Sequence, residues 1–216
     1  LQEKKDILCS CIYGIDIDIH AVEVAKFSLL IKLIEDETAP SVSEVVPILP
    51  DLGDNIQFGN SLVSQTELNG ISGANHQMME IAPFDWSTIN NGCGFDVIIG
   101  NPPYVNTEGM HALLPSAEVE IYKKKYKTSH KQFDKYFIFI EQAINKINEN
   151  GLVCYIVPNK FFKIGAGEKL RNLIAKERML VSLDDFGDAQ LFEDKTIYSS
   201  IILLSKAKQT SFVYSS

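Results

Sequence analysis

The four residues Asn101, Pro102, Pro103 and Tyr104 directly follow an apolar run and could do chemistry together. The run, Phe95–Ile99, has the β-branched composition of a strand that is covered on both faces. The two prolines fix the backbone after the strand and remove two amide donors. An asparagine side-chain oxygen and a main-chain carbonyl would then be rigid hydrogen-bond acceptors beside an aromatic ring. A stiff strand-exit turn and a short Pro-Pro ligand are the alternative interpretations.

Two other predicted strand ends also carry polar residues. Asp16 and Asp18 close the run CIYGIDID, and Gly59-Asn60-Ser61 follows the next short strand. Ligands of open α/β sheets bind outside the carboxyl ends of the strands, and an acid there often bonds ribose hydroxyls. For either aspartate alone, a helix cap is an equally good interpretation. The conjunction of three such ends favours a ligand site.

The elements that must position these residues alternate between strands and helices. Such alternation predicts an α/β fold with a doubly wound, mostly parallel sheet. Long loops are expected at Asp36–Asp54, at Asn60–Asn91 and, with patchy helix, at Asn106–His130. The predicted strands are Cys11–Asp18, Ile56–Gly59, Phe95–Ile99, Leu152–Pro158, Leu180–Phe186 and Ile197–Ser205, and the predicted helices are Ile19–Ile34, Gln132–Asn148 and Ala166–Lys176.

Composition narrows the class of protein. The 216 residues carry a net charge of −8, so the chain lacks the overall basic character of a general nucleic-acid binder. The lysines at 123, 124, 125, 127, 131 and 135 form its longest basic cluster, which is either a solvated face or a phosphate-contacting segment. Four cysteines lack zinc spacing and fit reduced thiols. We expect no metal site, no membrane span and a cytoplasmic protein.

The ordered motifs GIDID, FGNSL, FDVIIGNPPYV, QFDKYFIFIEQA, GLVCYIVPNKFF and LFEDKTIYSSIILL resemble those of gamma-class DNA adenine-N6 methyltransferases. The likeness is greatest to those of type IIG restriction–modification or phage-defence methylases, and it covers nearly the whole chain. It implies a Rossmann-like fold, S-adenosyl-L-methionine as cofactor, and double-stranded DNA with a flipped adenine as partner. It also implies a prokaryotic cytoplasm and a restriction nuclease and target-recognition domain, fused or separate.

The resemblance implies five cofactor-binding residues. Asp16 matches the ribose-binding acid, and Ile17 the apolar residue on the cofactor adenine. Asn60 matches the position that bonds the adenine amino group, where the family more often has Asp. Ser61 replaces a commoner apolar residue. Phe139 matches an aromatic residue that lines the same pocket.

The resemblance also implies the residues that handle the target base. Asn101 and the Pro102 carbonyl would accept the two N–H bonds of the adenine amine, with Pro103 holding them rigid. Tyr104 would stack on the flipped base. Phe192 matches an aromatic residue that packs on the same base, unless it is an ordinary core or loop aromatic, and Lys195 follows at the family's spacing.

The chain departs from the family in lacking a glycine-rich loop before GIDID. We therefore expect a partial catalytic domain over 1–216, incomplete at its N-terminal strand and inactive alone. Its parts would be 10–105 with the cofactor strands and NPPY motif, a lysine-rich loop at 106–131, and a helix–strand half at 132–206. The missing strand would leave the edges of Cys11–Asp16 and Phe95–Ile99 unpaired. Methylation of protein glutamine or RNA, and a non-catalytic binding module, remain alternatives.

Overall fold

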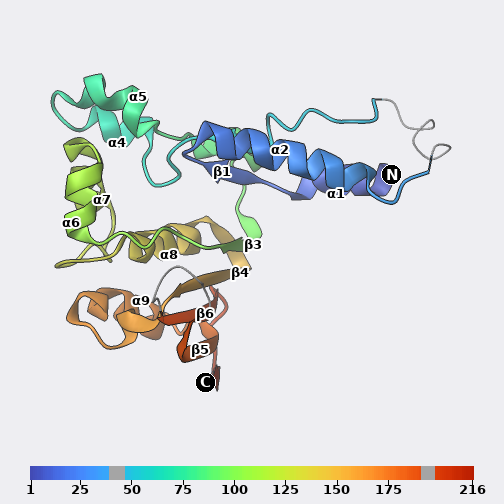
Figure 1. The fold of residues 1–216 in the computed structure, drawn as a ribbon. Coiled ribbons are helices and arrows are strands. Elements are labelled where there is room, and N and C mark those ends of the chain that lie inside the picture. The colour runs from blue at the N-terminus through green and yellow to red at the C-terminus, as the bar shows by residue number, and fades with distance from the viewer. Residues whose placement is uncertain (39–46, 191–197) are drawn as a thin grey trace. The chain divides into compact units, whose positions relative to one another are not determined.

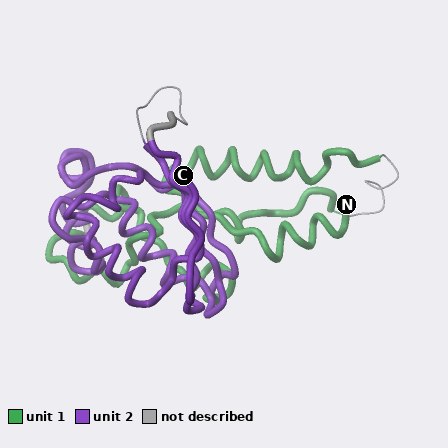
Figure 2. The backbone as a smooth tube through the Cα atoms, turned by 90° about the horizontal axis from the view of Figure 1, so that it is seen from below, with its two compact units in different colours: residues 1–93 green, residues 94–216 purple. Residues whose placement is uncertain are grey.

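The computed structural model describes residues 1–38, 47–190 and 198–216 (Figure 1). The chain divides into two compact units, Leu1–Cys93 and Gly94–Ser216 (Figure 2). Within the described ranges, no helix is long and apolar enough to cross a membrane.

Unit 1 opens with a βαβ arrangement. Helix α1 (Gln2–Cys11) leads into β1 (Gly14–Asp16), and helix α2 (Ile19–Ile34) connects it to β2 (Ile56–Phe58), which pairs with β1 in parallel. A core of aliphatic side chains holds these elements together: Leu8, Val22, Leu33, Leu52 and Ile56. The first strand is shorter than the predicted Cys11–Asp18, because α1 continues to Cys11.

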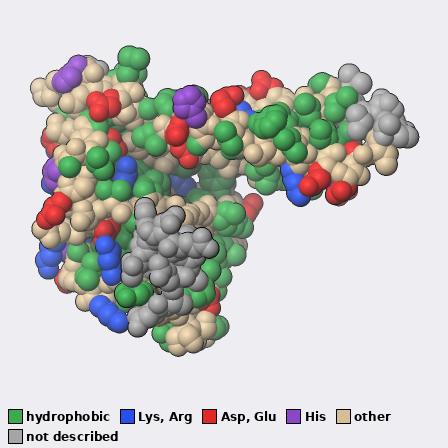
Figure 3. Space-filling view, viewed as in Figure 1, with side chains coloured by type: hydrophobic (Ala, Val, Ile, Leu, Met, Phe, Trp, Pro, Cys, Tyr) green, Lys and Arg blue, Asp and Glu red, His purple; other side chains and the backbone are tan. Residues whose placement is uncertain are grey.

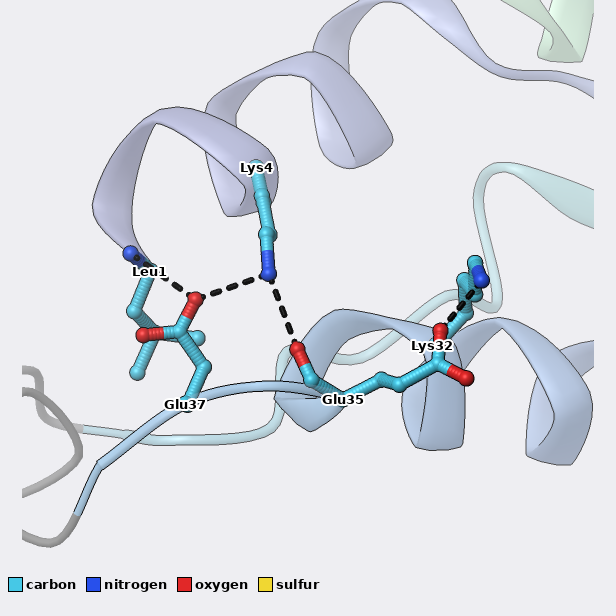
Figure 4. A network of polar contacts seen from close by, with 5 residues as sticks. All are labelled: Leu1, Lys4, Lys32, Glu35 and Glu37. Atoms are coloured by element: carbon cyan, nitrogen blue, oxygen red, sulfur yellow. Dashed lines mark hydrogen bonds and ion pairs between the residues drawn. The ribbon is translucent and has the colours of Figure 1, made fainter.

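The two ends of α2 are fixed by polar contacts. At its start, the Asp18 side chain accepts the His20 N–H (2.8 Å), so the predicted cap is confirmed. Near its end, Lys4 from α1 reaches the Glu37 carboxylate (2.9 Å) and the Glu35 carbonyl oxygen (3.0 Å) (Figure 4). Lys32 pairs with the Glu35 carboxylate, which raises the pKa of the lysine and lowers that of the acid. The contacts of Lys4 with Glu35 and Glu37 thus tie α1 to the end of α2.

The segment after β2 contains short helices where an irregular loop was expected. These are α4 (Gln65–Asn69), η1 (Ala74–Gln77), α5 (Met78–Ile81), η2 (Trp86–Thr88) and η3 (Asn90–Gly92). Ser64 and Glu67 form a reciprocal capping box at α4, a spacing that the sequence displays.

Unit 2 contains a five-stranded sheet in the order β3-β4-β6-β5-β7. The β3–β4 and β5–β7 pairs are parallel, and the β4–β6 and β5–β6 pairs are antiparallel. The sheet is thus mixed rather than mostly parallel, although the α/β class is as predicted. Its strands are β3 (Phe95–Gly100), β4 (Ile147–Pro158), β5 (Leu180–Gln190), β6 (Tyr198–Ser205) and β7 (Val213–Ser215).

The helices of unit 2 lie between its strands in the sequence. The expected loop at 106–131 is mostly helical, because α6 (Thr107–Leu113) and α7 (Ser116–Lys125) occupy it. Helix α8 (Lys135–Lys146) packs against β4 and ends two residues earlier than predicted, since the chain enters β4 at Ile147. Two 3₁₀ turns, η4 (Asn159–Phe162) and η5 (Gly165–Gly167), precede α9 (Glu168–Lys176).

Within the described part of the chain, β1, β2, β3 and β7 are edge strands, and β1 and β3 are the two that bear on the sequence prediction. Strand β1 pairs there with β2 alone, and β3 lies at the end of its sheet beside β4. Val97 and Ile99 of β3 are 55% and 76% exposed. Apolar side chains are also exposed over α2 (Figure 3), among them Val24 and Phe27. The unpaired edges of β1 and β3 were expected from the sequence, and those of β2 and β7 were not.

Candidate active site

The carboxyl end of the β1–β2 pair brings two predicted cofactor-binding residues to one edge. The Gly59 N–H donates to the Asp16 carbonyl oxygen (2.8 Å), so the turn after β2 lies beside the end of β1. The Asp16 side chain is exposed, and one of its oxygens accepts the Asp18 N–H (2.8 Å). A carboxylate has about four acceptor positions. Asp16 therefore has capacity to accept hydroxyl groups from a ligand at this edge.

Asn60 is buried and stabilises the turn after β2. Its side chain is 4% exposed, and its Oδ1 accepts the Leu62 N–H (3.1 Å). Ser61 is half-buried, and its carbonyl oxygen accepts the Trp86 indole N–H (3.1 Å). Ile17 is 47% exposed next to Asp16, as an apolar ligand contact requires. The turn thus combines an exposed acid and an exposed aliphatic side chain with a buried amide.

The Asn-Pro-Pro-Tyr motif follows β3 in unit 2. Asn101 and Pro103 are exposed, Pro102 is buried, and Tyr104 is half-buried. The Tyr104 hydroxyl contacts the Oδ1 of Asn101 as a donor and lies 3.1 Å from the Ile156 carbonyl oxygen on β4. Burial raises the pKa of Tyr104, so its hydroxyl stays protonated at neutral pH. The motif is therefore anchored to β4, with its asparagine side chain facing solvent.

Helix α8 also contacts the motif and the residue that follows it. The rings of Tyr104 and Tyr136 meet edge to face, with centroids 6.2 Å apart. The Lys135 N–H donates to the Val105 carbonyl oxygen (2.7 Å). Asp134 lies at the start of the same helix and pairs with Lys160 (3.0 Å). Sequence reasoning missed Asp134 and Lys160, although the first precedes an apolar helix and the second stands in the quoted VPNKFF.

The remaining predicted site residues have different outcomes. Phe139 is half-buried on α8, in the same unit as the Asn-Pro-Pro-Tyr motif. Phe192 and Lys195 lie outside the described residues. The four predicted cofactor-binding residues from Asp16 to Ser61 belong to unit 1.

The lysine-rich segment is held in place by buried polar groups. Lys135 pairs with Glu118 (3.5 Å), and burial lowers the pKa of the lysine. The Glu141 carboxylate accepts the N–H groups of Lys127 and Thr128 (3.1 and 2.8 Å). On the exposed side of this segment, Lys124 forms an ion pair with Glu120 (2.6 Å).

With this geometry established, sequence comparison identifies the family. The profile of the Eco57I restriction-modification methylase family matches residues 10–192. The chain belongs to this family. The match spans the acid at β1, the turn after β2, and the Asn-Pro-Pro-Tyr motif.

Relatives of this Eco57I-type chain are longer proteins. It is 44% identical over 213 residues to the type II restriction enzyme and methyltransferase RM.Eco57I of Escherichia coli, which covers 99% of this chain and 20% of that protein. The chain spans about a fifth of the length of the curated relatives that it matches first.

Solved structures share the fold. The cryo-EM structure of a DrdV–DNA complex matches 94% of this chain and 20% of that chain, with a TM-score of 0.62 and 15% identity. The M protein of the type I restriction enzyme EcoKI matches 93% of this chain and 32% of that chain, with a TM-score of 0.56 and 14% identity. The α/β fold is thus that of restriction–modification methyltransferases.

Proposed function

We propose that this chain is part of the catalytic domain of a DNA methyltransferase that transfers a methyl group from S-adenosyl-L-methionine to the N6 amine of adenine. The protein would act on double-stranded DNA in a prokaryotic cytoplasm, as part of a restriction–modification or phage-defence system. The observation that carries the proposal is the Asn-Pro-Pro-Tyr exit of β3, with Asn101 exposed and Tyr104 fixed to β4. Membership of the Eco57I restriction-modification methylase family and the fold shared with the protein of the DrdV–DNA complex support it.

The chemistry follows from the hydrogen-bonding capacity of Asn101. The lone pair of an exocyclic adenine amine is conjugated into the ring, so the amine is a poor nucleophile. An amide oxygen has two lone pairs, and the Tyr104 hydroxyl takes one of them. The second can accept an amine N–H, while the Pro102 carbonyl accepts the other. Two such bonds draw the nitrogen toward tetrahedral geometry and free its lone pair.

The rigidity of the motif makes these acceptors effective. Prolines fix the backbone, and Tyr104 bridges from the motif to β4, so the oxygens need not reorganise during the reaction. The flipped base would lie against the Tyr104 ring.

The cofactor would be held at the carboxyl end of β1–β2. The exposed Asp16 carboxylate suits ribose hydroxyls, and the exposed Ile17 suits the cofactor adenine. S-adenosyl-L-methionine, when bound, supplies an electrophilic methyl group on sulfur. Buried Asn60 and half-buried Ser61 would shape this edge through the turn.

Asn101→Ala in the complete protein tests the proposal. Methylation of adenine in duplex DNA should be abolished, because one of the two amine acceptors is lost, whereas cofactor affinity measured by calorimetry should stay within about two-fold. Asn150→Ala, at an exposed asparagine of β4, is the matched control and should keep wild-type activity. Methyl transfer that survives in the Asn101 variant at the wild-type rate would refute the assignment.

A protein glutamine amide or an RNA base could use the same two acceptors. The same assay with a glutamine-containing peptide and with single-stranded RNA separates these substrates. Transfer to either one in preference to duplex DNA would replace the DNA proposal.

A further inference from the structure

Asp134 has an unusual environment for a residue at the start of a helix. An aspartate at the N-cap normally accepts an N–H from the first helical turn. The Asp134 side chain makes no such bond to α8. It is 4% exposed, and its Oδ1 accepts from the Lys160 Nζ at 3.0 Å. A buried carboxylate needs a compensating partner, because its desolvation is costly. The structure gives it that partner from η4, beyond the end of β4.

The backbone around Asp134 is bonded to the exit of the Asn-Pro-Pro-Tyr motif. Asp134 forms an antiparallel bridge with Asn106. The neighbouring Lys135 N–H donates to the Val105 carbonyl oxygen (2.7 Å), and the Thr107 hydroxyl donates to the Phe133 carbonyl oxygen (2.8 Å). These contacts therefore join the start of α8, on both sides of Asp134, to the residues that follow the motif.

Lys160, the partner of Asp134, lies next to the end of a sheet strand. Lys160 follows Pro158, the last residue of β4, and the Tyr136 hydroxyl donates to the Pro158 carbonyl oxygen (3.3 Å). Strand β4 pairs with β3, which carries the motif. The ion pair thus closes a ring that runs through β3, the motif, the start of α8, η4 and β4.

We propose that Asp134 is a positioning residue for methyl transfer, which acts through its ion pair with Lys160 to hold the motif exit against α8 and thereby fix Asn101. This inference rests on the proposed function, because it assigns a role toward the same site. Asp134 touches the motif only through its backbone bridge to Asn106. Loosening the ring should therefore displace the amine acceptors by a small distance, which lowers the rate of the chemical step far more than it weakens binding.

The kinetic test uses the complete protein and three variants: Asp134→Asn, Lys160→Met and the double variant. Each single variant should lower kcat for adenine methylation at least about ten-fold, with KM for DNA and for S-adenosyl-L-methionine within about two-fold. The double variant should be no slower than the slower single variant, because both residues act through one contact. Lys160→Arg keeps a donor for the carboxylate and should recover most of the rate.

A structural readout separates this inference from the proposed function. Hydrogen exchange at the Tyr104–Thr107 amides should accelerate at least about ten-fold in Asp134→Asn and in Lys160→Met. Lys26→Met breaks the Lys26–Glu23 pair (3.1 Å) on α2 of unit 1, outside this ring, and should change neither exchange nor kcat. If exchange accelerates while the wild type methylates no adenine, the proposed function fails and the positioning of the motif stands.

Two results would overturn the inference. One is unchanged exchange at the motif exit in both single variants. The other is a loss of activity that thermal unfolding accounts for, with kcat per folded molecule equal to that of the wild type. Asp134→Asn removes the buried charge and keeps an oxygen acceptor, so it should fold even if Lys160→Met, which leaves the buried Asp134 carboxylate without its partner, does not.

Discussion

Gly59 connects β2 to the turn that carries Asn60, and no other residue type should fit there. Its φ of +155° lies in a region that glycine alone adopts readily. A Cβ added to it would lie 2.9 Å from Cδ2 and 3.1 Å from Cβ of Phe84. Phe84 is 3% exposed, so its ring has little room to move. Gly59→Ala therefore combines backbone strain with overpacking.

The size of the effect follows from these two terms. The backbone conformation costs about 1–3 kcal/mol for a residue with a Cβ. Forcing a methyl group into a packed core costs about 1–3 kcal/mol more. Gly59→Ala should thus lower the free energy of unfolding by about 2–6 kcal/mol. Gly73→Ala is the matched control, because its φ is +74° and a Cβ there would meet nothing within 4 Å. It should cost only about 1–2 kcal/mol of strain.

Urea unfolding followed by tryptophan fluorescence measures the difference. Trp86 is the only tryptophan of the chain, and its ring meets that of Phe84 at a centroid distance of 5.5 Å. The signal therefore reports on unit 1. Replacing Phe84 with Leu in the Gly59→Ala background should recover part of the loss. Equal losses for Gly59→Ala and Gly73→Ala would refute the packing argument.

Three further predictions concern the cofactor, pH and association. Asp16→Ala in the complete protein should weaken S-adenosyl-L-methionine binding by about 1–3 kcal/mol, because the ribose hydroxyls lose their acceptor. Calorimetry measures this affinity, and an unchanged value would remove the role from Asp16. Burial raises the pKa of Tyr136 and Tyr155 above the usual 10, so their stabilisation is complete below pH 10 and is lost as the pH rises further. Tyr155→Phe should reduce that loss by up to about 1.4 kcal/mol per pH unit in urea titrations between pH 10 and 11, and an unchanged slope would contradict the assignment. Residues 1–216 alone should catalyse no methyl transfer and should self-associate in light scattering across a dilution series. Val97→Lys should reduce the association, because Val97 is exposed on the edge strand β3.

The sequence predicted most accurately the helices and strands that carry clear local signals. Helix α2 matches its prediction at both ends, because Asp18 caps it and its apolar residues recur at helical spacing. Strand β3 extends one residue beyond its predicted end. The two strands predicted at the start of unit 1 pair in parallel, and the Gly59 N–H bond to the Asp16 carbonyl oxygen brings their polar ends together.

The errors arose where local pattern and tertiary packing disagree. The segment of α7 was predicted as a loop with patchy helix, because its lysine run hides an apolar face that buries Val119, Ile121 and Tyr122. Strand β7 was missed because it is short and exposed, and it is defined by its pairing with β5. The Asp134–Lys160 pair joins residues that only tertiary structure brings together.

The pairing of β4 has a consequence for the order in which unit 2 folds. Its Leu152 pairs with Val97 on one side and with Ser205 on the other, so both neighbours are distant in the sequence. Contacts between distant segments form slowly, because a long loop must close before they stabilise the chain. During synthesis, β4 can pair on its β3 side while β6 is still missing from the nascent chain. The open side of β4 is then an apolar strand edge that a chaperone would need to protect until Ser205 has emerged from the ribosome.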